Sequence, residues 1–245
     1  MEYRGSSVYD NDDFLCTYLM RRQRQASPNN ILEKPVLLQL IGEVKGKKVL
    51  DLGCGDAEIG KELLEAGCSF YEGVDGSVNM VAKAQQTITS KNSRIHMASM
   101  EEWDFPSESY DLVISRLALH YLGDLQKVVQ QIHRSIKPGG HFIFSVQHPI
   151  LTSSINHPEG EQKRSSWVVD DYFKMGDRTE KWMGKDVIKY HRTTEEYFRI
   201  VNDCGFRVST LKECTPQRKY FTSEEEYLRR VRVPVILLMK CVKAG

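Results

Sequence analysis

Two glycines and a following aspartate have the residue types and the spacing of a nucleoside-binding site. Gly53 and Gly55 come directly after a short apolar run, and glycine lacks a Cβ, so the backbone can turn sharply there and approach a ligand closely. Helical periodicity over residues 57–66 predicts a helix whose first N–H groups face that ligand. Asp75 ends the next apolar run and suits a carboxylate that accepts hydrogen bonds from ribose hydroxyls. The pattern predicts a nucleoside-containing cofactor.

Glu58, which follows the glycine turn, helps to distinguish between the possible cofactors. A dinucleotide fingerprint has its third glycine three residues after the second, and Glu58 occupies that position here. A carboxylate beside a pyrophosphate is repelled, so a nicotinamide-dependent oxidoreductase is the weaker interpretation. A cofactor with positive charge would instead be attracted by nearby carboxylates.

Asp51-x-Gly53-x-Gly55 together with Asp75 resembles the first two motifs of class I S-adenosylmethionine-dependent methyltransferases. S-adenosylmethionine has no phosphate, and its sulfonium and amino groups are cationic. The resemblance covers residues 45–147 closely and the last two strands loosely. It specifies the cofactor better than the methyl acceptor.

Further stretches carry the same resemblance. Residues 99–106 and 109–115 are similar to the family's loop after the third strand and to its fourth strand, and Lys137-Pro138-Gly139-Gly140 is a further family mark. Ser99 departs from the family's acidic or amide residue at its position, and Ala57 stands where many relatives have another glycine.

The resemblance implies a set of cofactor-binding residues. Asp75 would hold the ribose, Gly53 and Gly55 would lie against the methionine part, and Met100 would flank the adenine. S-adenosylhomocysteine would be the product. The full set is Asp51, Gly53, Cys54, Gly55, Asp75, Gly76, Ser99, Met100, Glu101 and Ser115.

An acceptor that is a hydroxyl or an ammonium needs a base, and two histidines are candidate catalytic residues. His120 follows the fourth strand, where the carboxyl ends of parallel strands face a ligand crevice. His191 precedes a helix at the end of an irregular stretch. A structural role is the alternative for each of them. No metal site is predicted, because His148, Asp170, Asp171 and His191 match no ligand spacing.

Composition narrows the partners of this 245-residue chain. A formal net charge of +1 gives no basic footprint for nucleic acid. After the fourth strand the chain reads Ser115-Arg116-Leu117-Ala118, without the Asp or Asn and Pro-Pro of nucleic-acid amino-methyltransferases, and no cysteine follows a proline. A small-molecule acceptor is therefore expected, with neither nucleic acid nor membrane as partner.

The cysteines and the apolar runs indicate the compartment. Six cysteines are scattered without a C-x-x-C pair, which fits reduced thiols and a cytoplasmic location. No basic and apolar leader opens the chain, and no apolar run is long enough to span a bilayer.

The elements that must position these residues alternate between strand and helix after Lys48, which predicts a parallel sheet with right-handed crossovers. The expected fold is α/β, a doubly wound, Rossmann-like, seven-stranded and mostly parallel sheet with an antiparallel terminal strand. We expect strands at 48–52, 69–75, 93–97, 110–115, 141–147, 206–214 and 233–242, and helices at 13–24, 30–41, 57–66, 77–89, 124–136, 193–204 and 223–230.

The predicted organisation is a single domain of residues 1–245 with four parts. Residues 1–44 form an N-terminal helical cover with a loosely held start, 45–147 the cofactor-binding core, and 191–245 a C-terminal helix and strand pair. Residues 148–190 are irregular and aromatic, which favours a lid over a small acceptor. An insert that packs on the sheet or forms a homodimer contact is the alternative. A non-catalytic cofactor-binding module acting through a protein partner is the rival function.

Overall fold

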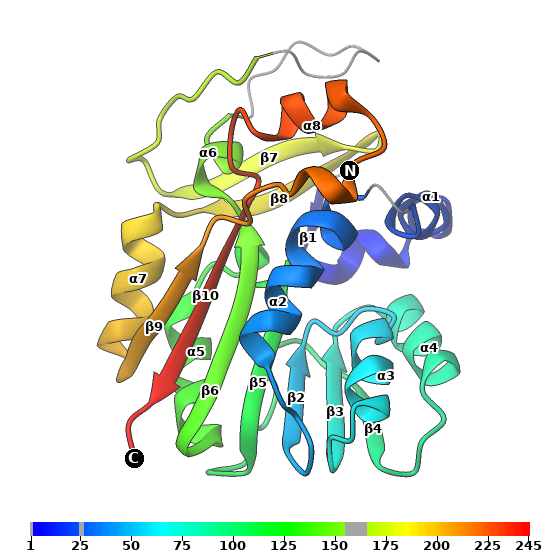
Figure 1. Ribbon diagram of the computed structural model, residues 1–245, viewed down its shortest axis with the longest axis vertical. Coiled ribbons are helices and arrows are strands. Elements are labelled where there is room, and N and C mark those ends of the chain that lie inside the picture. Colours follow the sequence, from blue (N-terminus) through cyan, green and yellow to red (C-terminus); the bar gives the residue numbers. More distant parts are fainter. Residues whose placement is uncertain (1, 25–26, 155–165) are drawn as a thin grey trace.

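The computed structural model describes residues 2–24, 27–154 and 166–245. Its centre is a seven-stranded sheet in the order β4-β3-β2-β5-β6-β10-β9, shown in Figure 1. The strands are β4 (Ser93–Met97), β3 (Phe70–Asp75), β2 (Lys48–Leu52), β5 (Tyr110–Arg116), β6 (Ile136–Gln147), β10 (Ile236–Lys243) and β9 (Phe206–Lys212). Neighbours from β4 to β6 are parallel, while β10 runs antiparallel to both β6 and β9. This arrangement confirms the predicted fold class.

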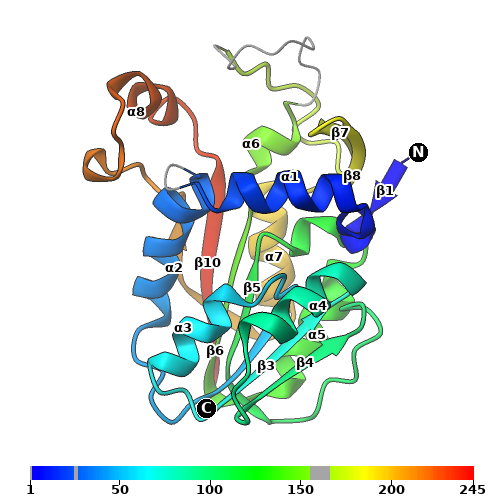
Figure 2. The ribbon, with the colours of Figure 1, turned by 90° about the vertical axis from the view of Figure 1, so that its right-hand side faces the viewer.

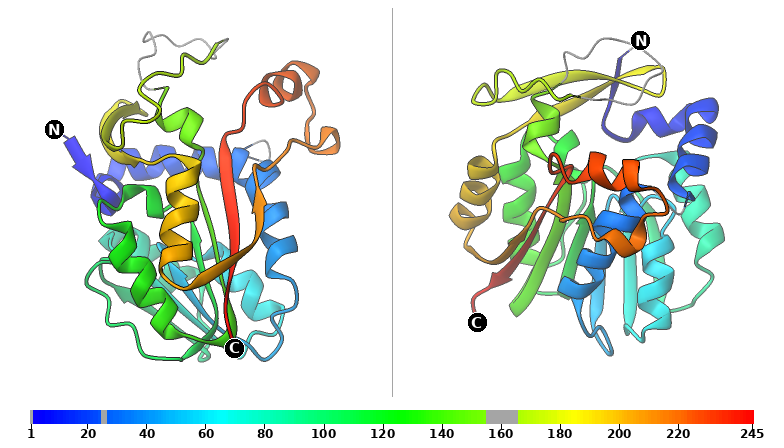
Figure 3. Two further views of the ribbon diagram at one scale, coloured as in Figure 1. Left: turned by 90° about the vertical axis from the view of Figure 1, so that its left-hand side faces the viewer. Right: turned by 45° about the horizontal axis from the view of Figure 1, so that its top comes forward.

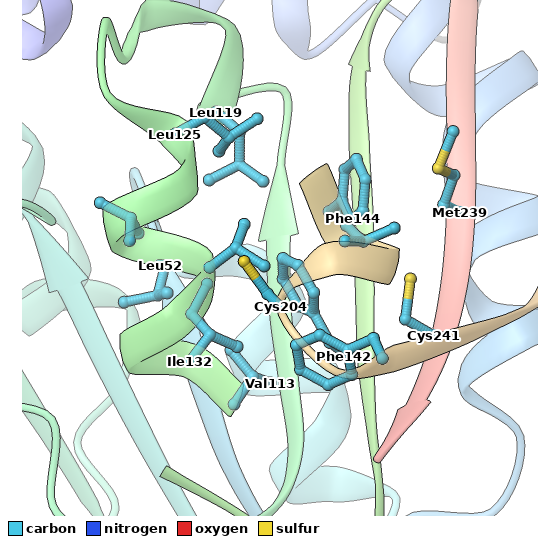
Figure 4. Close-up of a cluster of buried hydrophobic side chains, with 14 of the residues drawn as sticks. Leu52, Val113, Leu119, Leu125, Ile132, Phe142, Phe144, Cys204, Met239 and Cys241 are labelled. Carbon is cyan, nitrogen blue, oxygen red and sulfur yellow. The ribbon is translucent and has the colours of Figure 1, made fainter. Parts of the chain in front are cut away.

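Helices cover both faces of the sheet, because its central strands are apolar on both sides. Val49 and Leu50, which are consecutive in β2, are both fully buried and therefore point to opposite apolar layers. One layer packs against α5 and α7, and Figure 4 shows part of it. The other packs against α2, α3 and α4. The helices are α1 (Asp12–Arg22), α2 (Lys34–Ile41), α3 (Glu58–Glu65), α4 (Val78–Thr87), α5 (Leu125–Ser135), α6 (Pro149–Thr152), α7 (Thr194–Asp203) and α8 (Glu224–Arg230).

The last two strands are antiparallel neighbours, as predicted. The final strand, β10, is not the edge strand, because it lies between β6 and β9. The link between β9 and β10 carries a 3₁₀ turn, η4 (Arg218–Tyr220), and α8. In Figure 3, α8 stands beyond the end of the sheet at which β6 finishes.

The predicted start of the fifth strand at residue 141 was wrong. The strand β6 begins at Ile136, directly after α5, so Pro138 and Gly140 lie inside the strand. The sheet absorbs them through a shift of register opposite Tyr110 and Leu112 of β5.

Residues 148–190 are not irregular throughout, which corrects the sequence-based interpretation. Two strands, β7 (Gly176–Trp182) and β8 (Lys185–His191), form an antiparallel hairpin, and β1 (Glu2–Arg4) pairs in parallel with β8. The first residues of the chain are therefore held in a second, three-stranded sheet. The predicted lid of residues 148–190 includes residues 155–165, which lie outside the described residues.

This second sheet lies over the carboxyl ends of the parallel strands. The 3₁₀ helix η1 (Gly5–Asp10) and α1 continue from β1 across the same end, as Figure 2 shows. We call the set of β1, η1, α1, β7, β8 and α8 the cover. In the part of the chain that the structure describes, no helix has the length and apolar character needed to cross a membrane.

Candidate active site

The turn between β2 and α3 is held against the neighbouring strands. The N–H groups of Gly53 and Cys54 both donate to the carbonyl oxygen of Val74, at 2.8 and 3.1 Å. Gly53 and Gly55 have φ values of +72° and +57°, in the left-handed region that favours glycine. A Cβ added to Gly53 would lie 2.5 Å from the Cβ of Ala118, which follows β5. The turn therefore needs glycine both for its backbone angle and for its close approach.

Asp75 is fixed at the end of β3 by backbone donors. The N–H of Gly55 donates to its Oδ2 and the N–H of Ser77 to its Oδ1, both at 2.9 Å. Burial raises the pKa of this carboxyl, while the two N–H donors act in the opposite direction. The carboxylate thus ties the glycine turn to the next strand.

Asp51 is buried beside the same turn but is only half satisfied. The hydroxyl of Tyr71 donates to its Oδ2 at 2.8 Å, and among the described residues no donor reaches its buried Oδ1. Burial raises the pKa of Asp51 to about 7, although the Tyr71 hydroxyl and the charge of Arg116 favour the ionised form. A buried carboxylate oxygen without a partner fits a site that a ligand donor completes.

One cavity of about 1250 Å³ connects this turn with the cover. Nine of the ten predicted cofactor-binding residues line it, and so does His120. The nine are Asp51, Gly53, Cys54, Gly55, Asp75, Gly76, Ser99, Met100 and Glu101.

Ser115, the tenth residue of the predicted cofactor set, is not among the residues that line the cavity. Its side chain is fully buried within the sheet, and its hydroxyl donates to the carbonyl oxygen of Leu52 at 2.8 Å. The hydroxyl therefore links β5 to β2 and takes a structural role.

His120 lies in a short 3₁₀ turn, η3 (Leu119–Tyr121), after β5. Its Nδ1 accepts the backbone N–H of Gln147 at 3.4 Å, so the neutral ring carries its proton on Nε2. Burial lowers the pKa of His120 well below its ordinary value, and the charges of Lys189 and Arg192 lower it further. At neutral pH this side chain is an uncharged hydrogen-bond donor.

His191, the second predicted catalytic histidine, is not among the residues that line the cavity. The ring is fully buried at the end of β8. Its Nδ1 is 2.6 Å from the hydroxyl of Thr152, and its Nε2 is 2.8 Å from the carbonyl oxygen of Tyr172. Both ring nitrogens are thus used to join β8 to the segment that follows β6.

The cover contributes an aromatic wall to the cavity. Tyr9, Tyr18 and Trp182 of the cover line it, and Tyr121 of η3 completes the wall. The ring of Tyr9 packs edge-on against Tyr18 and Trp182, with centroids 4.9 and 6.3 Å apart. These contacts bring together η1, α1 and β7 over the crevice.

Charged residues of the wall are paired across elements. The Lys189 ammonium of β8 forms an ion pair with Glu180 of β7, and it also donates to the side-chain oxygen of Gln147 at 2.8 Å. Arg22 of α1 pairs with Asp56 at 3.0 Å, beside the glycine turn.

Sequence reasoning named part of this wall and missed another part. The N-terminal helical cover predicted at residues 1–44 contains Tyr18, Arg21, Arg22 and Arg24, and all four line the cavity. Sequence reasoning missed Tyr9 and Lys189 as lining residues, because their approach depends on the pairing of β1 with β8 across most of the chain.

The glycine turn and the two carboxylates, at the carboxyl ends of a doubly wound sheet, define a protein that binds a nucleoside-containing cofactor. The profile of a family described as a methyltransferase domain matches residues 50–144. The crystal structure of an S-adenosylmethionine-dependent methyltransferase from Mesorhizobium loti has a TM-score of 0.79 and 31% identity, and the match covers 86% of this chain and 98% of that one. The chain belongs to the S-adenosylmethionine-dependent methyltransferases, with S-adenosylmethionine as cofactor.

Two curated relatives extend this likeness. An uncharacterised protein of Haemophilus influenzae is 30% identical over 220 residues, which are 84% of this chain and 85% of that protein. A sarcosine/dimethylglycine N-methyltransferase of Aphanothece halophytica is 25% identical, over 82% of this chain and 72% of its own length.

Proposed function

We propose that this enzyme transfers the methyl group of S-adenosylmethionine to a small-molecule acceptor that binds under the cover. The observation that carries the proposal is the single cavity, which runs from the glycine turn to the aromatic wall and His120. Such a cavity has room for a cofactor and for an acceptor, and the cover excludes water from the space between them.

The residues of the turn suit the cofactor. We propose that Asp75 binds the ribose and that the unpartnered Oδ1 of Asp51 accepts a hydrogen bond from the amino group. Arg22, beside Gly55, would bind the carboxylate of the methionine part. When bound, S-adenosylmethionine supplies a methyl group on a positively charged sulfur, which an acceptor atom can displace in line.

On the acceptor side, the state of the His120 ring favours a role in positioning the acceptor over a role as a base. Its protonated Nε2 can donate to an oxygen or nitrogen of the acceptor and hold that atom in place. A ring with so low a pKa is a weak proton acceptor. An acceptor that is already deprotonated needs no base at all, so this geometry favours an anionic or neutral nucleophile.

Three further observations support the proposed acceptor class, the absence of a nucleic-acid partner and the cytoplasmic location. The Aphanothece halophytica relative is named for small amines that carry a carboxylate, which supports a small-molecule acceptor here. The net charge of +1 argues against nucleic acid. All six cysteines are free thiols, which supports the predicted cytoplasmic location.

Calorimetric titration of the purified protein with S-adenosylhomocysteine, against a reduced nicotinamide cofactor as control, tests the cofactor side. We expect micromolar binding of the first alone. Transfer of labelled methyl from S-adenosylmethionine to members of a small-molecule library then tests the activity. Binding without any labelled product, together with a stable protein partner, would favour the non-catalytic module.

A further inference from the structure

The charges that line the cavity are separated between its two ends. Near the glycine turn and the loop after β4 the wall carries four carboxylates, Asp51, Asp75, Glu101 and Glu102, and the two arginines there, Arg22 and Arg116, are both ion-paired. The far end, between α1 and α8, is basic. Four arginines contribute to it, and we call them the arginine cluster: Arg21 in α1, Arg24 two residues beyond its end, and Arg229 and Arg230 in α8.

The two arginines of α8 share one carboxylate. Glu226 lies 2.6 Å from the guanidinium of Arg229 and 3.0 Å from that of Arg230. The side chains of Arg229 and Arg230 are only 20% and 16% exposed, so solvent screens their charges incompletely. Burial and repulsion by Arg229 lower the pKa of Arg230. Positive charge is therefore in excess at this point.

The α1 side adds to this excess. Arg22 is paired with Asp56, whereas within the described part of the chain no carboxylate pairs with Arg21 or Arg24. The side chains of Arg21 and Arg24 are exposed, so an incoming anion can reach both of them. The planar guanidinium matches carboxylate and phosphate groups with two parallel hydrogen bonds.

We propose that the methyl acceptor carries an anionic group, a carboxylate or a phosphate, which the arginine cluster binds between α1 and α8. The inference rests on the proposed function and specifies its acceptor. The anchored group fixes one end of the acceptor, and the nucleophilic atom then lies toward His120 and the glycine turn within the same cavity. An acceptor with net positive charge is disfavoured by the same arginines.

Binding of simple probes to the protein saturated with S-adenosylhomocysteine tests this site. The probes are succinate and inorganic phosphate as anions and ethanolamine as a cation, at constant ionic strength set with chloride. We expect at least one anion to bind and to raise the melting temperature, and its affinity to fall about tenfold or more in Arg229→Gln/Arg230→Gln. Succinate alone would indicate a carboxylate acceptor, and phosphate alone a phosphorylated one.

Two further variants make the result specific. Arg199→Gln removes one positive charge, as Arg24→Gln does, from an exposed ion-paired site on α7, outside the cavity, and should leave anion affinity unchanged. Arg24→Gln tests the α1 side if the double variant fails to fold, and should weaken the same anion. Binding of ethanolamine with neither anion, or equal anion affinity in all variants, would overturn the proposal. Affinity for S-adenosylhomocysteine is measured first, on the wild-type protein and on each variant. Failure of the wild-type protein to bind it would refute the proposed function, whereas loss of anion binding with cofactor affinity kept concerns the arginine cluster alone.

Discussion

Two aspartates that are equivalent in the sequence pattern have different surroundings in the fold. Both oxygens of Asp75 accept backbone N–H groups, so this carboxylate also has a structural part in the turn. Asp51 is buried with one oxygen unpartnered among the described residues. The motif predicted both residues, but partners and burial depend on packing, which residue types alone do not specify. The difference leads to a separate prediction for Asp51.

Replacing Asp51 by Asn should stabilise the cofactor-free protein at alkaline pH. The pKa of Asp51 is about 7 in the folded protein, against an ordinary value of 3.8. The folded state therefore favours the protonated carboxyl, and the contribution of Asp51 to the free energy of unfolding is fully present below about pH 4 and is lost as the pH rises through 7. Relative to wild type, Asp51→Asn should gain about 1 to 3 kcal/mol between pH 5 and pH 8. Urea unfolding at the two pH values measures this gain, and an equal difference at both would contradict the raised pKa. The variant should also bind S-adenosylhomocysteine more weakly.

The state of His120 predicts the pH dependence of methyl transfer. Because its pKa lies well below 6.5, the ring stays neutral above pH 7, and a donor role predicts a rate that is flat from there upward. His120→Ala should lower turnover of an identified acceptor about 10- to 100-fold with cofactor affinity kept, while His120→Gln, which can still donate, should retain more activity. A rate that rises with pH in the range below 6.5, through the lowered pKa of His120, and a rise that disappears in His120→Gln, would show that His120 acts as a base instead.

At the scale of elements, the apolar core strands could be predicted and the cover hairpin could not. β2 has the predicted bounds, because a buried parallel strand is an apolar run between turn signals. The edge strand β4 also has the predicted bounds, although it is only partly buried. β7 alternates charged residues on both faces, and its two-residue turn is Met183-Gly184, with φ of +49° and +78°. Without the usual Asn-Gly or Asp-Gly pair, this hairpin turn has no distinct sequence signal. The pairing of β8 with β1 joins distant parts of the chain, and it has no local sequence signal either.

The turn between β2 and α3 yields a prediction with a matched control. Gly53 and Gly46 have nearly equal φ values, +72° and +75°, but an added Cβ meets Ala118 only at Gly53 and has open space at Gly46. Gly46→Ala should cost about 1 to 2 kcal/mol from backbone strain and leave cofactor affinity unchanged. Gly53→Ala should cost more, through added crowding, and should weaken S-adenosylhomocysteine binding about tenfold or more. Equal behaviour of the two variants would refute the close approach of the turn.

At the scale of the whole molecule, the N-terminal part is joined to the core by buried polar contacts. Glu33, at the end of the π-helical turn η2 (Asn29–Glu33), is fully buried. It binds the guanidinium of Arg116 through both oxygens and accepts the hydroxyl of Ser145 at 3.0 Å. On the other side of the crevice, Asp10 accepts the hydroxyl of Ser77 at 2.7 Å. The wall of the cavity therefore depends on contacts between parts far apart in the sequence.

Removal of Glu33 tests whether this joint stabilises the molecule. Glu33→Ala leaves the Arg116 guanidinium buried without its carboxylate, and loss of one partner of a buried pair costs about 3 to 5 kcal/mol. Lys34→Ala is the matched control, because its ion pair with Glu62, at 2.5 Å, is about one-third exposed and should contribute about 0 to 1 kcal/mol. Urea unfolding of both variants measures the difference.

A double variant separates the lost charge partner from lost packing. Glu33→Ala/Arg116→Met removes the unpaired guanidinium, so it should be less destabilised than Glu33→Ala alone, although Arg116 lines the cavity and its loss should reduce cofactor affinity. If Glu33→Ala were no less stable than Lys34→Ala, the buried pair would not hold the N-terminal part on the sheet. The aromatic wall would then have to be positioned by the second sheet alone, through the pairing of β1 with β8.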